Sequence, residues 1–135
     1  MPEELPPGNR GAGSGDMRIK AVRGATVVSA DEPNLLSEAV VELLVEMTGS
    51  NGILTDDIVS VLFTMTTDLR SEFPARAARA LEGWREVPML CTSEIDVPGA
   101  LPKCIRVLMH VYSTRSRDDI RHIYLGDARQ LRPDL

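Results

Sequence analysis

Residues 104–109, CIRVLM, are the most apolar run of the chain, and an arginine stands in their middle. In a β-strand successive side chains point to opposite faces of the sheet, so positions 105, 107, 109 and 111 predict one continuous apolar face. Arg106 belongs to the other face, together with Cys104, Leu108, His110 and Tyr112. A buried arginine without a partner would cost several kcal/mol. We therefore expect Arg106 to reach solvent, an acidic side chain or a cavity that receives an anion.

Length and composition favour one acidic domain. The chain has 135 residues, 43% of them hydrophobic, which is enough for one core and short for two. The formal net charge is −5 at pH 7 and no basic run is present, which argues against a nucleic-acid partner and against an anionic membrane surface. Lys20 and Lys103 are the only lysines, so 13 of the 15 basic residues are arginines. Arginine binds carboxylates through paired hydrogen bonds, which suits a small anionic ligand.

The cysteines and histidines predict neither disulfides nor a metal site. Cys91 and Cys104 are the only cysteines, and no signal peptide precedes them, which favours free thiols in a reducing compartment. His110 and His122 lack metal-ligand spacing relative to either cysteine. No apolar stretch approaches the roughly 20 residues that span a bilayer. We expect a cytoplasmic protein.

The chain divides into a short extension and one domain. Residues 1–16, MPEELPPGNRGAGSGD, are rich in Pro and Gly and offer almost nothing to bury, which predicts a flexible N-terminal extension before a domain over residues 17–135. The apolar patterns predict strands over 18–28, 58–66, 87–92, 103–112 and 121–125. Residues 115–119, RSRDD, are expected to form a solvated loop.

Two helices are expected between these strands. Apolar residues at helical spacing from 35 to 47 predict an amphipathic helix that begins in the capping segment 29–33 and ends at Gly49 and Gly52. A short helix over 74–81 is expected to close at Gly83. This order of elements implies an α+β domain with a mixed β-sheet and helices packed on one face.

Arginines and a strand end supply the candidate binding groups. The arginines with suggestive neighbours are Arg23, Arg79, Arg106 and Arg132. Arg23 precedes Gly24, which would let the backbone approach a ligand closely. Cys91 and Glu94 stand where a predicted strand gives way to the loop DVPG, residues 96–99. Sites are commonly built from polar groups at strand ends.

At these residues the sequence resembles the monofunctional chorismate mutases of the trimeric, pseudo-α/β-barrel class. The matching pieces are IKAVRGAT (19–26), FPARA (73–77), GW (83–84), VP (87–88), Cys91, Glu94, DV (96–97), KCIRV (103–107), IRHIYL (120–125) and LRPDL (131–135). They occur in the family's order and cover essentially residues 17–135. The chain departs from the family pattern at Arg76, where lysine is common, and at Leu90, where a small polar residue is common.

The resemblance implies an enzyme that rearranges chorismate, a dicarboxylate enol ether, into prephenate on the route to phenylalanine and tyrosine. The family's step is intramolecular and pericyclic, and it needs no nucleophile, metal or redox cofactor. Breakage of the C–O bond leaves negative charge on the ether oxygen in the transition state. A preorganised cation at that oxygen stabilises charge that is largely absent from the ground state.

The resemblance also implies a role for each candidate residue. Arg106 would lie at the ether oxygen, Arg23 and Tyr124 would bind carboxylate oxygens, and Glu94 and Cys91 would take the ring hydroxyl beside a wall that includes Leu90. The family assembles as a homotrimer with sites at subunit interfaces. The neighbouring subunit would contribute Phe73, Ala75, Arg76 and Arg79, while Leu131 would line the pocket and Arg132 would lie at its mouth.

Two other functions are compatible with the same residues. One is a non-catalytic trimeric binding module for small dicarboxylates, which would need a disrupted cation where Arg106 is intact. The other is an unrelated α+β protein that binds carboxylates. Considered singly, Cys91 would more often be a small core residue, Glu94 a solvated loop acid, Tyr124 a half-buried strand aromatic and Arg79 a surface helix residue.

Overall fold

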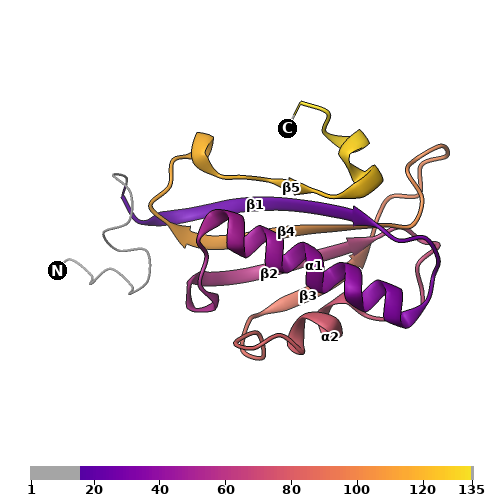
Figure 1. Cartoon of the computed structure of the whole chain (residues 1–135), viewed down its shortest axis with the longest axis horizontal. Coiled ribbons are helices and arrows are strands. Elements are labelled where there is room, and N and C mark those ends of the chain that lie inside the picture. Colours follow the sequence, from indigo (N-terminus) through magenta and orange to yellow (C-terminus); the bar gives the residue numbers. More distant parts are fainter. Residues whose placement is uncertain (1–15, 135) are drawn as a thin grey trace.

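The protein is a five-stranded sheet with two α-helices, and the computed structural model describes residues 16–134 (Figure 1). The strands are β1 (Arg18–Val27), β2 (Ile58–Met65), β3 (Met89–Ser93), β4 (Cys104–Ser113) and β5 (Ile123–Tyr124). The helices are α1 (Pro33–Asn51) and α2 (Pro74–Arg79), with 3-10 turns η1 (Thr55–Asp57), η2 (Arg117–Asp119) and η3 (Gly126–Leu131). The predicted flexible extension lies outside the described residues, except for Asp16.

The sheet is mixed, as the order of elements predicts. The strand order is β3-β2-β4-β1-β5, with β4 antiparallel to both β1 and β2. The two edge strands run parallel to their neighbours, β3 along β2 and β5 along β1. The most apolar stretch of the sequence therefore forms the central strand, where both of its edges are paired.

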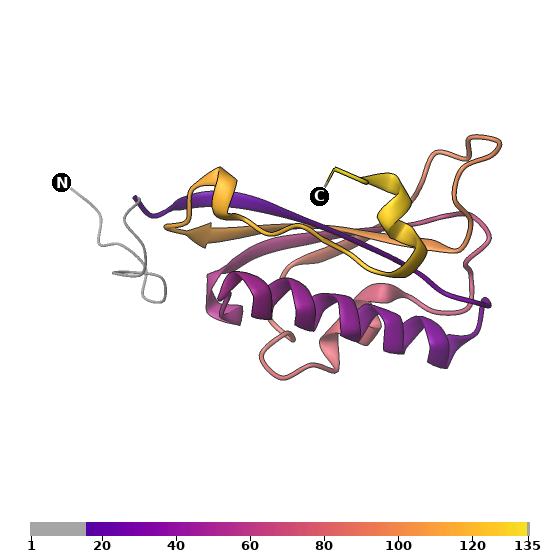
Figure 2. The same ribbon diagram turned by 45° about the horizontal axis from the view of Figure 1, so that its top comes forward.

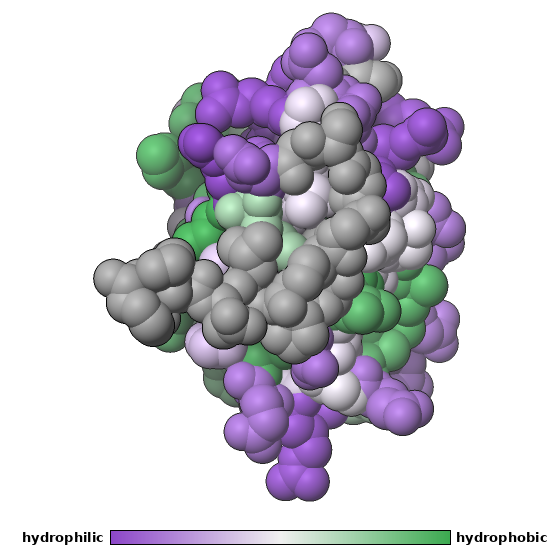
Figure 3. All heavy atoms as spheres, turned by 90° about the vertical axis from the view of Figure 1, so that its left-hand side faces the viewer, coloured by the Kyte–Doolittle hydropathy of each residue, from purple (hydrophilic) through white to green (hydrophobic). Residues whose placement is uncertain are grey.

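Both α-helices lie on the same face of the sheet (Figure 2). The predicted apolar face of β4 is confirmed, because Ile105, Met109 and Val111 have no exposed surface and Val107 has 3%. This face packs in one core with the buried side of α1, while α1 also contacts β1 and α2. Beyond the grey segment, the end at which β1 begins is mainly hydrophilic, with smaller hydrophobic patches (Figure 3).

Gly24 serves the packing of α1 on β1. A Cβ atom at Gly24 would overlap the sulfur of Met47 and crowd Leu43, both on α1. The sequence suggested that Gly24 allows close approach of a ligand. The structure shows that its missing side chain first allows close approach of the helix.

Helix α1 begins within the predicted capping segment and ends next to Gly52, as predicted, but no side chain caps its start. The N-cap residue is Glu32, which makes no side-chain cap. The Asp31 carboxylate instead accepts hydrogen bonds from the backbone N–H groups of Arg70 and Ser71, both at 3.0 Å. The helix passes through Gly49 and ends at Asn51, with Gly52 in the left-handed conformation at φ 61°. The Asp31 carboxylate, which could have capped the helix, is therefore used in a tertiary contact with the segment that contains Arg70 and Ser71.

Other segments differ in part from their predictions. The second helix, α2, ends at Arg79 and not at 81. Residues 115–119 are not simply a solvated loop, because they include η2 and because Arg115 Nη1 donates to the Ser50 carbonyl at 3.2 Å. The last strand contains two residues and not five.

No described helix is long and apolar enough to cross a membrane.

Candidate active site

The register of the sheet places the candidate residues in lateral rows on the face without α-helices. Strand partners point to the same side of a sheet. One row crosses the strands from Tyr124 through Ala25, Arg106 and Thr64 to Thr92. The neighbouring row contains Arg23, Leu108, Leu62 and Leu90. Residues that lie up to 101 positions apart in the chain, Arg23 and Tyr124, thus share one surface.

A depression of about 260 Å³ lies over these rows. It is lined by Arg23, Gly24, Leu62, Thr64, Glu94, Arg106, Val107, Leu108 and Tyr124. Four of the residues singled out from sequence therefore meet here: Arg23, Glu94, Arg106 and Tyr124. The lining combines two guanidinium groups, one carboxylate and a phenol with apolar side chains, a composition suited to a small anionic molecule.

Arg106 and Glu94 face each other in this depression. Arg106 Nε lies 3.5 Å from Glu94 Oε2, and their side chains are 46% and 24% exposed. The acidic partner expected for Arg106 is therefore Glu94. A guanidinium has five N–H donors in a planar fork. Since almost half of the side chain is accessible, Arg106 can bind a ligand while it contacts Glu94.

Glu94 is held from two sides. The Thr64 hydroxyl of β2 donates a short hydrogen bond to Glu94 Oε2. The backbone N–H of Glu94 donates to the Met65 carbonyl at 2.8 Å, which ties the start of the loop after β3 to the end of β2. Thr64 was not identified as a site residue from sequence, because its role depends on the register of β2 with β4 and β3.

Arg23 and Tyr124 approach from the β1–β5 edge. Both are half-buried. The backbone N–H of Arg23 donates to His122 Nδ1 at 2.9 Å, a contact that sequence reasoning missed by treating His122 only as a sheet residue. Burial, with the positive charges of Arg23 and Arg132, lowers the pKa of His122 below its ordinary value. The imidazole is therefore neutral at neutral pH.

The C-terminal candidates lie next to Tyr124. Arg132 and Tyr124 line a second hollow beside the depression, and Leu131 is half-buried at the end of η3. Arg132 forms a bidentate pair with Asp134, through Nε at 3.0 Å and Nη2 at 2.8 Å. The hydrogen-bonded Asp134 carboxylate raises the pKa of Arg132 above its ordinary value, so the guanidinium is always charged.

Leu90 and Cys91 lie on the edge strand β3. Leu90 is in register with Leu62, on the same face as Arg106, and is 73% exposed. Cys91 is in register with Phe63, whose side chain lies on the face of the sheet opposite to Arg106. Cys91 does not line the depression. Cys91 is exposed, so it is not the small core residue that a lone cysteine would suggest. Cys104 is buried, as expected.

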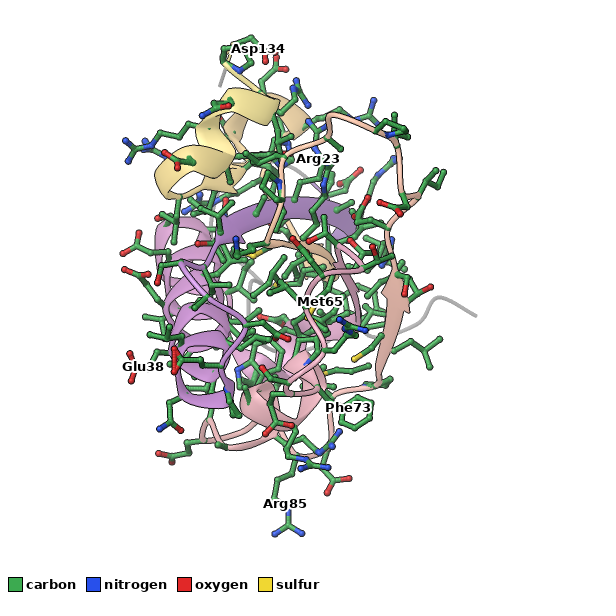
Figure 4. All side chains as sticks on the ribbon, turned by 90° about the vertical axis from the view of Figure 1, so that its right-hand side faces the viewer. Arg23, Glu38, Met65, Phe73, Arg85 and Asp134 are labelled. Atoms are coloured by element: carbon green, nitrogen blue, oxygen red, sulfur yellow. The ribbon has the colours of Figure 1, made fainter. Side chains whose placement is uncertain are left out.

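The α2 candidates lie away from the depression within this subunit. Figure 4 shows Phe73 and Arg23 toward opposite ends of the view, with Arg23 nearer Asp134. Phe73 is 60% exposed, and the Arg76 guanidinium lies 5.5 Å from its ring centroid. Arg79 is exposed, whereas Ala75 is only 7% exposed and packs in the subunit's own core. None of the four lines the depression.

The described part of the chain offers no cluster for a metal ion. Residues 16–134 contain no group of three or more His, Cys, Asp or Glu side chains arranged to hold one. The depression brings together hydrogen-bond donors, cations and one carboxylate.

Comparisons with known proteins identify the family of the chain. The sequence profile of the chorismate mutase type I family matches residues 19–135. The chain is 43% identical over 119 residues to the chorismate mutase AroH of Bacillus subtilis (strain 168), covering 88% of this chain and 94% of that protein. It is 44% identical over 118 residues to chorismate mutase AroH of Thermus thermophilus, covering 87% and 96%.

A solved structure supports the same relationship. The chain superposes on a chorismate mutase from Clostridium thermocellum with a TM-score of 0.80 and 47% sequence identity, covering 82% of this chain and 98% of that one. The sequence resemblance, the α+β fold and the family profile all agree over nearly the whole described domain. The chain belongs to the chorismate mutase type I family.

Proposed function

We propose that the protein is a chorismate mutase that converts chorismate to prephenate in the biosynthesis of phenylalanine and tyrosine. The observation that carries this proposal is the accessible Arg106 guanidinium beside Glu94, in one depression with Arg23 and Tyr124. The chain belongs to the chorismate mutase type I family, and these groups can bind a dicarboxylate and stabilise negative charge that develops on its ether oxygen.

The reaction breaks one C–O bond and forms one C–C bond within a single molecule. The breaking bond leaves negative charge on the ether oxygen, and the allyl fragment becomes electron-poor. Arg106 donates N–H bonds to the ether oxygen and stabilises this developing charge. No proton has to move during the step, so arginines and one carboxylate suffice.

The other residues hold the substrate in its reactive conformation. Arg23 and Tyr124 bind carboxylate oxygens from the β1–β5 side of the depression. Glu94 accepts a hydrogen bond from the ring hydroxyl and faces the electron-poor fragment, while the Cys91 backbone supplies a further contact for that hydroxyl, because the Cys91 side chain belongs to the opposite face of the sheet. Holding the reacting carbons close together removes much of the entropy cost of the step.

The complete site is proposed to lie between subunits of a homotrimer. The sheet face that carries the depression has no α-helix over it among the described residues, and apolar side chains near the β3 edge are strongly exposed, with Leu90 at 73% and Ile95 at 84%. A neighbouring copy covers this face and brings Phe73, Ala75, Arg76 and Arg79 to the pocket. Ala75 contributes through its backbone, because its side chain is buried in its own subunit. Leu131 lines the pocket and Arg132 lies at its mouth.

The two free cysteines suit a reducing compartment, and we propose that the enzyme acts in the cytoplasm.

The activity is tested by following the ultraviolet absorbance of chorismate after addition of purified protein that has been dialysed against a chelator. We expect turnover far above the uncatalysed rate and formation of prephenate. Saturable binding of chorismate without turnover would instead favour a dicarboxylate-binding module.

A further inference from the structure

His122 makes a contact that the catalytic roles above leave unused. Its Nδ1 accepts a hydrogen bond from the Arg23 backbone N–H at 2.9 Å. An imidazole nitrogen can accept only when it carries no proton, so the geometry requires a neutral ring with its proton on Nε2. His122 does not line the depression that contains Arg23, Glu94, Arg106 and Tyr124.

This contact extends a very short strand pairing. β5 pairs with β1 only at Gly24–Ile123 and Ala25–Tyr124. One residue before the Gly24–Ile123 pair, the His122 side chain accepts the Arg23 backbone N–H. In a longer strand pairing a backbone carbonyl of β5 would accept this N–H. Arg23 and Tyr124 are the two residues of this edge whose side chains line the depression. The imidazole therefore joins the two segments that present them.

The surroundings of His122 favour its neutral form. His122 lines two hollows of the surface, and both contain charged or titratable groups. These groups are Lys20, Arg23, His110, Arg117, Glu46, Tyr124, Arg129 and Arg132. Glu46 is the one carboxylate in this set, against five Lys or Arg side chains. Burial and the nearby guanidinium groups of Arg23 and Arg132 lower the pKa of His122. Protonation would replace an acceptor with a second donor facing the Arg23 N–H.

We propose that His122 is a positioning residue: its neutral imidazole fixes the Arg23 backbone against β5, so that the Arg23 and Tyr124 side chains converge on one substrate carboxylate. This role rests on the proposed mutase function. It acts through Arg23, and it requires no proton transfer to or from substrate.

Paired substitutions distinguish this role from general packing. In His122→Asn the Oδ1 atom stands the same number of bonds from Cα as Nδ1, so it can accept the Arg23 N–H. In His122→Gln the amide oxygen stands one bond further, as Nε2 does. We expect the Asn variant to keep kcat/KM within about threefold of wild type, and the Gln variant to lose roughly five- to tenfold, mainly through KM. The matched control is His110→Gln, because His110 contacts Ser60 and not Arg23.

The pH dependence supplies a second test. Because the pKa of His122 is lowered, KM should stay constant through neutral pH and rise only on the acid side, below the ordinary value of 6.5. The Asn variant should lack the acid-side rise that belongs to His122. Equal losses in the Asn and Gln variants, or no loss in either, would overturn the positioning role.

A third readout does not depend on catalysis. Long-range ¹H–¹⁵N spectra of wild-type protein should show His122 as the Nε2–H tautomer with an unprotonated, hydrogen-bonded Nδ1. A proton on Nδ1 at neutral pH would overturn the inference even in an active enzyme. An inactive wild-type protein with the expected tautomer would reject the proposed function, and the positioning role with it, while leaving the Arg23 contact established.

Discussion

Arg106 is held close to an acid without being covered by it. Exposed or half-exposed ion pairs typically contribute about 0–1 kcal/mol to stability, so the Arg106–Glu94 pair stabilises the fold only slightly. Its value lies in orientation, because Glu94 contacts Nε and is itself held by Thr64. The fork is thereby aimed before a ligand arrives, and catalytic electrostatics depend on such preorganisation.

Replacing Arg106 should therefore affect chemistry and spare the fold. We expect Arg106→Ala to lower kcat by about 10²- to 10³-fold or more, the usual cost of losing a donor at a developing oxyanion. Arg106→Lys should recover little, since a single ammonium replaces a planar fork. Steady-state kinetics measure the effect, and thermal unfolding of each variant controls for stability. If Arg106→Lys keeps nearly wild-type kcat, the guanidinium does not act at the ether oxygen.

Three neighbouring substitutions should differ in a graded way. Glu94→Ala is expected to lower kcat by roughly 10²-fold, since it removes the carboxylate that is proposed to face substrate. Thr64→Val should cost about 1 kcal/mol, roughly fivefold, because Glu94 loses one hydrogen bond. Cys91→Ser should be nearly silent, since no thiolate attack is proposed. The same chorismate assay ranks them, and a covalent substrate adduct on Cys91 by mass spectrometry would contradict the pericyclic mechanism.

Among the elements, α1 and the segment before β5 are joined by one buried side chain. Asn51, 2% exposed at the end of α1, donates from Nδ2 to the carbonyls of Met47 and Arg121 at 2.8 Å. Its Oδ1 accepts the Arg121 N–H at 2.7 Å. The side chain thus satisfies both backbone groups of Arg121, as a strand partner would. This explains why β5 is shorter than its sequence pattern predicts.

Loss of Asn51 should loosen the β5 edge. We expect Asn51→Ala to lower the free energy of unfolding by about 2–3 kcal/mol, because it removes three hydrogen bonds made by a buried side chain. Urea denaturation measures this loss, and faster hydrogen exchange at the Arg121 amide should accompany it. Asn34→Ala is the matched control, since Asn34 is exposed in the first turn of α1. Equal stability of the two variants would contradict the proposed tie.

At the scale of the whole molecule, a buried acid links stability to pH. Asp57 is 2% exposed, and its Oδ2 has no hydrogen-bond partner among the described residues. Burial, with the Asp56 carboxylate, raises the pKa of Asp57 above 3.8. The folded state therefore binds this proton more tightly than the unfolded state does. Its stabilising contribution is complete below 3.8 and disappears as pH rises through the raised pKa.

An Asp57→Asn variant isolates this contribution. The free energy of unfolding of wild type minus that of the variant should fall as pH rises from about 4 toward neutrality. Urea denaturation across this range measures the difference, and Asp118→Asn, at an exposed position in η2, provides the control. A difference that increases with pH would mean that the folded state lowers the pKa of Asp57.

In the proposed homotrimer, assembly decides whether the site is complete. Mixing Arg106→Ala chains with Arg79→Ala chains should restore activity if Arg79 serves the neighbouring subunit's site, because some trimers then contain one site with both arginines. The matched control mixes Arg106→Ala with Arg23→Ala. Both of those arginines line the same subunit's depression, so no intact site can form. Rescue in the control, or a fully active monomer by sedimentation, would contradict the shared-site proposal.

Local patterns predicted much of the fold and part of the site. The alternation in β4 separated a buried face from the face that carries Arg106, and helical spacing found α1, because both periodicities follow from backbone geometry within one segment. The family motifs named Arg23, Glu94, Arg106 and Tyr124, which the structure brings into one depression. The boundaries of β5 and the cap of α1 were missed, because tertiary partners took over their hydrogen bonds.

The sequence by itself determined which segments form strands and helices, which face of each is apolar, and which residue types are available for an anionic substrate. These are properties of neighbouring residues. Only the tertiary structure decided that Thr64 holds Glu94, that Asn51 binds Arg121 and that His122 accepts the Arg23 N–H. Each of these contacts depends on strand order and register, which arise when segments 30 to 99 residues apart pack together, and no local pattern encodes that choice.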